Sequence, residues 1–341
     1  MTTAITGQDW RAHARRLADE LQQAGKLTGP RWREAICAVA RHHLVPSYYQ
    51  QDTDGTWRQI LSGTAEGLAA VYSNTVLITA LAPAAAGTTV LSSSTQPGLM
   101  TRMLEALDIH DGHRVLEIGT GTGYNAALLT HRLGDSRVFS VDVEPELVEL
   151  ARERLAVLGY HPTLIAGDGA AGLPEHAPFD RIIATCAVPR IPWTWVEQTR
   201  PGGIILTDLK PALGAGSLVR LTRTDTDRAE GRFDATFAAF MDLRHQPGAN
   251  PATSRVDRDH HHAAHRATAT DPRTPWTSLI VWFLASFDLG PGISYGYAGH
   301  SPDGPRPTWI ATPDGSWAEI TLPTTTATTR SPKAAPGDCG R

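Results

Sequence analysis

The sequence predicts a doubly wound α/β sheet, preceded by helices and followed by a small α+β extension. Apolar runs of strand length alternate with helix-like stretches between residues 113 and 207. The first run, Val115–Ile118, leads into glycines at three alternate positions within Gly119–Gly123. Two later runs end at or just before an acid, Asp142 and Asp168. Because ligands bind outside the carboxyl ends of the strands in such sheets, these features predict a ligand site there.

Two helices are expected before the sheet, at residues 9–24 and at about 30–41. In the first, alanine and leucine recur at helical spacing, and Gly25 follows its end. The second leads into His42 and His43, which could serve as ligands or bases. A polar helix end before a proline is the favoured interpretation of these histidines.

The segment between residues 50 and 98 has a weaker pattern. We expect a polar turn at residues 51–56, short strands at 71–72 and 75–79, and a loop at 83–88. Ser92–Thr95 then place four hydroxyls before Gln96 and a helix at 98–107. These side chains can cap the helix or hold an anionic group at its N-terminus. The residue types alone favour neither interpretation.

The core of the sheet is predicted from residue 113 onwards. Strands are expected at residues 114–118, 137–142, 163–166, 180–185 and 203–207. Helices are expected near residues 124–133, 145–158 and 192–199. Pro145 at a helix start and Gly159 after its end delimit the second of these helices.

The glycine turn meets the physical requirements of a nucleotide site, because glycine permits a sharp turn and the helix N-terminus offers free N–H groups. The spacing is G-x-G-x-G after Glu117, which differs from the G-x-G-x-x-G of dinucleotide sites. No Lys-Ser/Thr pair follows, as a P-loop would need. Asp142 lies 23 positions after Gly119, where an acid can accept both hydroxyls of a ribose. A glycine turn that serves packing alone is the disfavoured alternative.

The pattern changes after residue 209. Residues 217–223 and 233–241 could complete the sheet as an antiparallel pair, and the next segment, rich in Pro, Thr, His and Asp, is expected to be a linker or loop. Asp259–His265 within it holds four histidines. A metal site is conceivable there, but a solvated loop is favoured because no strand or helix pattern fixes the side chains.

Order is expected to return in an apolar stretch, Trp276–Phe287, and in a hairpin of residues 308–311 with 317–320. The aromatic residues of this extension indicate a small core, and a peptide-binding wall is the alternative. The predicted organisation is an N-terminal helical and substrate-facing segment, a ligand-binding core, a linker or loop, an extension and a disordered tail, at residues 1–110, 111–244, 245–275, 276–322 and 323–341.

The totals limit the class of protein. A formal net charge of −4 over 341 residues argues against general nucleic-acid binding. We expect no membrane span and no signal peptide, because no apolar run reaches about 18 residues and the first residues lack a basic region before an apolar core. The three scattered cysteines, Cys37, Cys186 and Cys339, predict neither a disulfide framework nor a zinc site, and they fit a cytoplasmic protein.

Residues from about 30 to 210 resemble protein-L-isoaspartate O-methyltransferases. The matching segments are Ala38–Pro46, Ser94–Pro97, Met103–Leu107, Val115–Tyr124, Gly167–Gly169, Ala177–Ile183 and Arg200–Gly203. The resemblance implies a Rossmann-like methyltransferase fold with S-adenosylmethionine (SAM) as cofactor and no metal. It implies methyl transfer to a side-chain or α-carboxylate at an aspartyl or isoaspartyl residue of a peptide or protein. The ester then closes to a succinimide (aspartimide).

The resemblance also implies residue roles. Thr95 takes the position of the family's acceptor-orienting serine, helped by Ser94 and Ser93. Asp142 would hold the ribose and Asp168 would lie near the adenine. The full set implied to bind the cofactor is Glu117, Gly119, Thr120, Gly121, Thr122, Gly123, Asp142, Val143, Asp168 and Gly169. No general base is required, because a carboxylate is already ionised at neutral pH.

Two departures from the family pattern bear on the substrate. The approach to Thr95 lacks the usual Pro-Leu-Pro-Ile-Gly-like segment, and roughly a hundred C-terminal residues extend beyond the resemblance. These features resemble the branch found beside ribosomal peptide pathways, which favours a dedicated, lanthipeptide-like peptide as substrate. General isoaspartyl repair is the first alternative, and a small-molecule SAM methyltransferase is the second. A catalytically silent SAM-binding protein is disfavoured by the intact glycine motif and acids.

Overall fold

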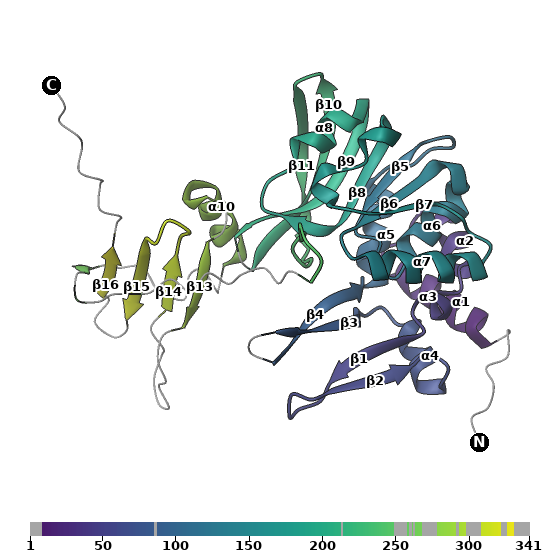
Figure 1. The fold of residues 1–341 in the computed structure, drawn as a ribbon, viewed down its shortest axis with the longest axis horizontal. Helices are drawn as coiled ribbons and strands as arrows, with labels where there is room; N and C mark the ends of the chain where they lie inside the picture. Colours follow the sequence, from purple (N-terminus) through teal and green to yellow (C-terminus); the bar gives the residue numbers. More distant parts are fainter. Residues whose placement is uncertain are drawn as a thin grey trace. The chain divides into compact units, whose positions relative to one another are not determined.

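The chain divides into two compact units in the computed structural model (Figure 1). The structure describes residues 9–84, 87–212, 214–248, 258, 261, 263–267, 278–290, 293–297, 308–321 and 326–330. The first unit comprises residues 1–187, 191–208 and 218–250. The second comprises residues 188–190, 209–217 and 251–341. The expected division at residue 110 is therefore not a boundary between compact units.

A seven-stranded sheet organises the first unit, in the order β11-β10-β9-β8-β5-β6-β7. Its strands are β5 (Val115–Ile118), β6 (Val138–Asp142), β7 (Thr163–Ala166), β8 (Phe179–Val188), β9 (Thr199–Ala212), β10 (Ala215–Asp225) and β11 (Arg228–Phe237). Strand β5 pairs in parallel with β6 and β8, and β6 pairs in parallel with β7. The strand order therefore reverses between β5 and β8, which confirms the predicted doubly wound sheet.

The helices between these strands begin and end close to the predicted positions. They are α6 (Tyr124–Leu133), α7 (Pro145–Val157) and α8 (Trp193–Gln198), with 3-10 turns η1 (Asp135–Arg137), η2 (Gly169–Ala171) and η3 (Pro174–His176). Pro145 opens α7, and Gly159 follows it with a φ of +78°, as a C-terminal cap requires. Helix α7 packs on β6 and β7.

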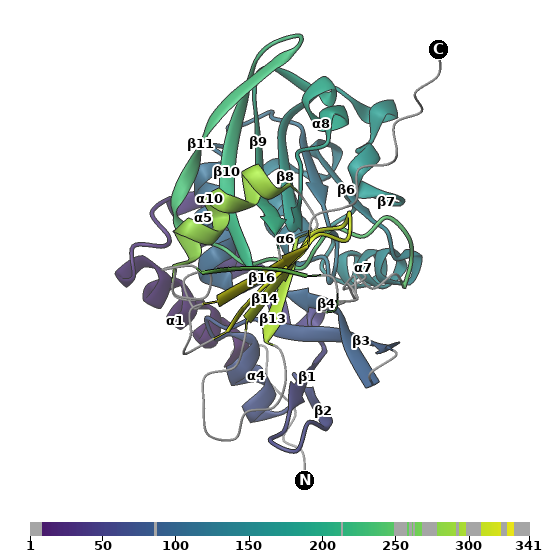
Figure 2. The same ribbon diagram turned by 90° about the vertical axis from the view of Figure 1, so that its left-hand side faces the viewer.

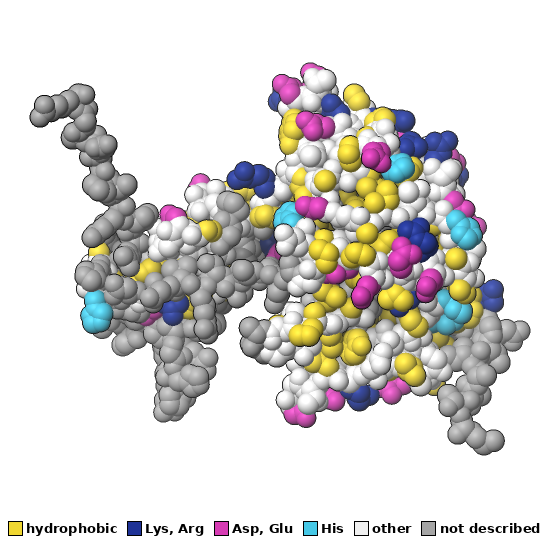
Figure 3. All heavy atoms as spheres, viewed as in Figure 1, with side chains coloured by type: hydrophobic (Ala, Val, Ile, Leu, Met, Phe, Trp, Pro, Cys, Tyr) yellow, Lys and Arg dark blue, Asp and Glu magenta, His cyan; other side chains and the backbone are white. Residues whose placement is uncertain are grey.

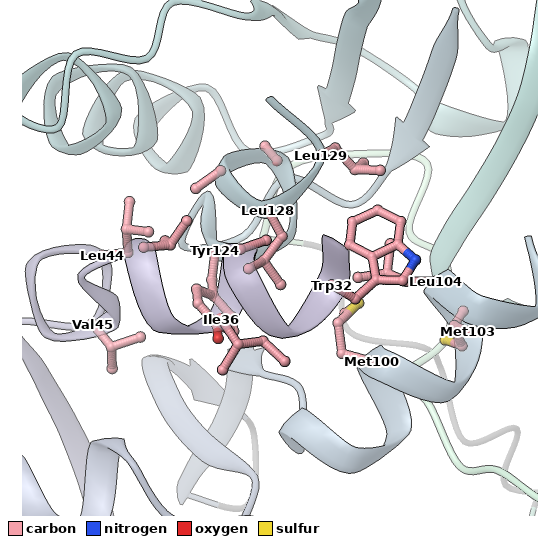
Figure 4. Close-up of a cluster of buried hydrophobic side chains, with 14 of the residues drawn as sticks. Trp32, Ile36, Leu44, Val45, Met100, Met103, Leu104, Tyr124, Leu128 and Leu129 are labelled. Carbon is pink, nitrogen blue, oxygen red and sulfur yellow. The ribbon is translucent and has the colours of Figure 1, made fainter. Parts of the chain in front are cut away.

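In the described part of the chain, five helices precede the sheet, namely α1 (Asp9–Gln23), α2 (Pro30–Ala38), α3 (Arg41–Leu44), α4 (Ala65–Val71) and α5 (Pro97–Ala106). Figure 4 shows how α2, α5 and α6 share one apolar core. Trp32 and Ile36 of α2 lie with Tyr124 and Leu128 of α6, and with Leu104 of α5. All five side chains are buried. The N-terminus of α5 lies next to the carboxyl ends of the strands, since Gly98 shares a cavity lining with Thr185 of β8.

A second sheet, in the order β2-β1-β3-β4, lies in the same unit (Figures 1 and 2). Its strands are β1 (Ser47–Gln51), β2 (Trp57–Leu61), β3 (Leu77–Ala84) and β4 (Gly87–Ser94). Two expectations were wrong here. The strand expected at residues 71–72 is the end of α4, whose N-terminus is capped by the Thr64 hydroxyl accepting from the Gly67 N–H at 3.0 Å. The segment expected to be a loop at 83–88 contains the paired ends of β3 and β4, because the β-branched residues Thr88–Val90 favour a strand and Gly87 adopts a φ of +113°.

The second unit contains helix α10 (Leu279–Leu289) and a five-stranded sheet in the order β12-β16-β15-β14-β13. The strands are β12 (Ala264–Ala267), β13 (Ser294–Tyr297), β14 (Thr308–Ala311), β15 (Trp317–Thr321) and β16 (Thr326–Arg330). The predicted hairpin is confirmed, since Ala311 pairs with Trp317 across the turn. Trp282 and Phe283 form a small core with Ile293.

Two sequence-based boundaries of the extension differ from the structure. Strand β12 lies inside the segment expected to be a linker, and β16 lies inside the segment expected to be disordered. They pair with each other, so neither strand is visible as a local pattern. In the histidine cluster, residues 259, 260 and 262 lie outside the described residues, and His265 is exposed on β12. Across the described ranges, no group of three His, Cys, Asp or Glu side chains could hold a metal ion, and no helix is long and apolar enough to span a membrane.

Candidate active site

A cavity lies where the strand order reverses, at the carboxyl ends of β5, β6 and β8. We call it the glycine-turn cavity; its lining comprises Leu91–Ser93, Ile118, Gly119, Gly121, Val141–Val143, Leu147, Gly169, Thr185, Cys186 and Met241–Arg244. The predicted Gly119, Gly121, Asp142, Val143 and Gly169 all line it. The position matches the expected ligand site of a doubly wound sheet.

The glycine turn needs glycine for its backbone and for the space above it. Gly119, Gly121 and Gly123 have φ values of +96°, +52° and +84°. A Cβ on Gly119 would lie 2.7 Å from the Thr185 hydroxyl, which donates to the Gly119 carbonyl at 2.9 Å. The intervening Thr120 and Thr122 are buried and do not line the cavity. Their role is therefore to shape the turn.

Asp142 is held rigidly at the cavity wall. One carboxylate oxygen accepts from the Gly121 N–H at 2.9 Å, and the other accepts from the Glu144 N–H at 3.1 Å. Burial raises the pKa of Asp142, while these N–H donors and the Arg244 guanidinium oppose the rise. Each carboxylate oxygen keeps a further lone pair for a ligand hydroxyl.

Asp168 is the second of the two acids predicted to bind the cofactor. Its carboxylate caps η2 by accepting from the Ala170 N–H at 2.9 Å, and His245 Nδ1 lies 3.0 Å from its second oxygen. Gly169, directly after it, lines the cavity, and a Cβ there would meet Ile118 at 2.5 Å. Asp168 itself is not part of the lining, so the structure places it beside the cavity.

Glu117 is buried under the glycine turn, away from the lining. Its carboxylate accepts from Asn125 Nδ2 at 2.8 Å and from the Ser140 hydroxyl at 2.5 Å. Burial raises the pKa of Glu117 to about 7. The side chain therefore ties β5 to α6 and β6, and it does not line the glycine-turn cavity.

A segment that sequence analysis did not single out closes the glycine-turn cavity. We call residues Met241–Gly248 the strap. Its backbone pairs with Ala187 at the end of β8 through hydrogen bonds of 2.8 Å on either side. Arg244 forms an ion pair with Glu144 and donates to the Leu91 carbonyl, and Glu144 also accepts from the Gly248 N–H at 2.7 Å. These side-chain partners are between 100 and 153 residues apart, so no local motif reveals them.

A second cavity, of about 800 Å³, meets the first. We call it the α5 cavity, because the N-terminal turns of α5 form one wall. Ser93, Thr185 and Met241 line both cavities. Thr95 also lines the α5 cavity, whereas Ser94 is buried and points elsewhere. Of the three predicted hydroxyls, the structure therefore brings Ser93 and Thr95 to the cavity and leaves Ser94 out.

Arg41 explains the orientation of Ser94. This fully buried guanidinium donates to the Ser94 hydroxyl at 3.0 Å, to the Thr95 carbonyl at 3.3 Å and to the Val71 carbonyl at 2.7 Å. It also stacks on Tyr124, with Cζ 4.9 Å from the ring centroid. Burial lowers the pKa of Arg41. Arg41 thus fixes the positions of Ser94 and Thr95. In the sequence, only the family-like segment Ala38–Pro46 pointed to Arg41.

His42 and His43, which could have served as bases, lie outside both cavity linings. His42 Nδ1 is 2.9 Å from the Tyr72 hydroxyl, and burial lowers the pKa of His42 to about 4. His42 is therefore a neutral side chain that packs α3 against Tyr72.

Comparison with known proteins adds a family assignment. The family model for protein-L-isoaspartate(D-aspartate) O-methyltransferase (PCMT) matches residues 12–238. The chain belongs to the PCMT family. A protein-L-isoaspartate O-methyltransferase of Aeropyrum pernix is 37% identical over 191 residues, which is 55% of this chain and 63% of that protein. One from Rhodospirillum rubrum is 38% identical over 185 residues, covering 52% of this chain and 80% of the relative. The match therefore spans less than two thirds of the Aeropyrum relative.

Solved structures support the PCMT fold. One protein-L-isoaspartate O-methyltransferase aligns over 94% of this chain and 88% of its own, with a TM-score of 0.56 and 22% identity. A putative one from Plasmodium falciparum, in complex with S-adenosyl-L-homocysteine, aligns over 67% of this chain and 97% of its own, with a TM-score of 0.50 and 14% identity. The strap and residues 251–341 lie beyond the part that the PCMT model matches.

Proposed function

We propose that this chain transfers a methyl group from SAM to a carboxylate of an aspartyl or isoaspartyl residue in a peptide or protein. The observation that carries the proposal is the meeting of two cavities at Ser93 and Thr185. One cavity has the glycine turn and Asp142, and the other has the hydroxyls. The glycine-turn cavity opens toward the larger α5 cavity. This opening suits a peptide acceptor better than a metabolite enclosed beside the cofactor.

The residues present fit SAM. Gly119 and Gly121 line the cavity without side chains, so a ligand can approach the backbone closely, and Asp142 can accept from ribose hydroxyls. When bound, SAM supplies an electrophilic methyl group on a sulfonium. Asp168 is proposed to lie near the adenine, with Val143 and Gly169 along the wall between the two acids.

The chain's own contribution to the reaction is alignment and removal of water. The acceptor carboxylate is ionised at neutral pH, so no base is needed, and both candidate histidines lie outside the cavities. A hydrated carboxylate is a weak nucleophile, and enclosure beside Phe240 and Leu99 strips water from it. Thr95 and Ser93 are proposed to donate to one carboxylate oxygen, which leaves the other free to react.

Replacing Thr95 with alanine is expected to lower kcat by about 10-fold, because one hydrogen bond from a hydroxyl to the acceptor carboxylate is lost. SAM affinity should stay within error, since Thr95 lines only the α5 cavity. Thr95→Ser keeps the hydroxyl and should retain most of the rate. Steady-state kinetics and SAM titration check the pair of variants; equal loss in both would rule out the hydroxyl's role.

Replacing Arg244 with methionine is expected to weaken SAM binding by about 10-fold, because the strap loses its ion pair to Glu144 and Asp142 loses a nearby cation. Calorimetric titration with SAM measures the change. Arg228→Met is the matched control, because this exposed arginine pairs with Glu230 on β11. An Arg244 variant that binds SAM as tightly as the control would show that the strap does not contribute to the cofactor site.

For the natural substrate, a dedicated ribosomally made peptide, lanthipeptide-like in character, is the proposal, and general isoaspartyl repair is its alternative. The β3–β4 hairpin supports the dedicated peptide, because it replaces the family's usual approach to Thr95. The C-terminal extension is not by itself support, since a solved PCMT aligns over 94% of this chain.

Mass spectrometry can separate these substrates. Each candidate peptide is incubated with SAM and scanned for a gain of one CH₂ group. Transfer to unrelated isoaspartyl peptides indicates repair. Transfer only to a normal aspartate of one partner peptide, followed by loss of methanol to give a succinimide, indicates a dedicated enzyme. Transfer to a metabolite and to no peptide would overturn the peptide proposal.

A further inference from the structure

The α5 cavity differs in charge from the protein that surrounds it. Its lining includes Lys26 and Arg102 but neither Asp nor Glu, although the whole chain has a formal net charge of −4. On the outer face shown in Figure 3, by contrast, basic and acidic side chains are interspersed. Because both charged side chains of this lining are basic, the cavity attracts anions, and its apolar walls strengthen that attraction.

Lys26 follows α1 and reaches across the first turn of α5. Its Cδ lies where a Cβ on Gly98 would be 2.8 Å away, so the side chain runs directly over that glycine. In the described part of the chain, no carboxylate lies within 4.0 Å of its ammonium. Asn74 already satisfies the helix end, since its Oδ1 accepts from the Gly98 N–H at 2.8 Å. Lys26 lines the α5 cavity and brings to its wall a cation without a carboxylate partner among the described residues.

Arg102 lies four residues after Gly98, on the same face of α5. Its partners are distant: Nε is 3.8 Å from Asp234, and Nη2 is 3.4 Å from the Thr236 carbonyl. Nε is buried and makes no hydrogen bond. Arg102 lines the α5 cavity together with Lys26, and its long contact with Asp234 leaves donor capacity for a further acceptor.

The cavity is larger than one carboxylate requires. About 800 Å³ falls in the upper range of small-molecule pockets, which span roughly 300–1,000 Å³. Ser93 and Thr185 mark the junction with the glycine-turn cavity, whereas Lys26 lines only the α5 cavity. The α5 cavity therefore has room for residues next to the acceptor, and it has a cationic wall apart from the acceptor's position.

We infer that Lys26 and Arg102 form a subsite for a second carboxylate of the acceptor peptide. The substrate class is then an acidic peptide, in which another Asp, Glu or terminal carboxylate lies close to the methylated residue. This inference rests on the proposed function and deepens it, because it names the sequence context that the enzyme selects.

The test uses the full chain and four peptides, each made with an aspartyl and with an isoaspartyl acceptor, carrying Glu, Gln or Lys as the neighbouring residue on its C-terminal side, or Glu on its N-terminal side. Peptide binding is measured by fluorescence anisotropy with S-adenosylhomocysteine present, and KM is measured in parallel. The wild-type chain should bind one of the Glu peptides about 10-fold more tightly than the Gln peptide. Lys26→Met should reduce that ratio to about 2, and Lys26→Glu should favour the Lys peptide.

Arg16→Met is the control, because Arg16 pairs with Glu20 on the exposed side of α1. It should retain the wild-type ratio, and SAM affinity should not change in any variant. Equal binding of the Glu and Gln peptides by the wild type would overturn the inference, as would an unchanged ratio in Lys26→Glu. Failure of the proposed function is distinguishable, because it would appear as selective binding without methyl transfer.

Discussion

Replacing Asp142 with alanine is expected to weaken SAM binding by about 100-fold, because two charge-assisted hydrogen bonds to the ribose are lost, each worth roughly 1.5–3 kcal/mol and not fully additive. The Gly121 and Glu144 N–H groups fix both carboxylate oxygens at the cavity wall, so the acceptors are preorganised. Calorimetric titration with SAM and with S-adenosylhomocysteine measures the change.

Two controls accompany the Asp142 variant. Asp142→Asn keeps one oxygen acceptor and should bind SAM with intermediate affinity. A thermal melt shows whether the variants remain folded, because the backbone donors around Asp142 also lose a partner. Wild-type affinity in a folded Asp142→Ala protein would remove the ribose assignment.

Replacing Glu117 with glutamine is expected to change how stability depends on pH. The folded-state pKa of Glu117 is about 7, above the ordinary value of 4.5. Between these values the folded state binds more protons than the unfolded state, so wild-type stability falls as the pH rises through this window. A difference of this size corresponds to about 3 kcal/mol between pH 4 and pH 8. The glutamine variant should not lose this stability as the pH rises.

Denaturant unfolding of both proteins at pH 5, 6, 7 and 8 measures the difference directly. The stability of Glu117→Gln relative to the wild type should increase with pH and level off above pH 7. Glu149→Gln, an exposed position on α7, controls for a general charge effect. Parallel pH profiles for the wild type and Glu117→Gln would show that burial does not raise the pKa of Glu117.

The sequence predicted the parts of the fold that local pattern determines. The buried runs of β5 and β6, Pro145 and Gly159 each carry a signal within a few residues. The β3–β4 hairpin and the β12–β16 pair were missed because their hydrogen bonds join segments whose own composition resembles loops. Tertiary pairing determined these strands.

The candidate site divides in the same way. Gly119, Gly121 and Asp142 were predicted because a strand end, a turn and an acid follow one another along the chain. The placement of Ser94 and Glu117 away from the cavity was not predictable, because each depends on a buried partner from another element: Arg41 for Ser94, and Ser140 for Glu117. Arg244 and Glu144 were missed because they meet only in the folded chain.

The central claim, carboxyl methylation with SAM as donor, is tested most directly with SAM labelled in its methyl group. The full chain is incubated with an isoaspartyl peptide, its aspartyl twin and any partner precursor peptide, and the products are then treated with mild base. A carboxyl methyl ester releases its label as volatile methanol, so the account predicts label that enters a peptide and leaves on base treatment. Asp142→Ala should transfer little label at low SAM concentration. Label that stays on the peptide after base, or enters none of the peptides, would contradict the account.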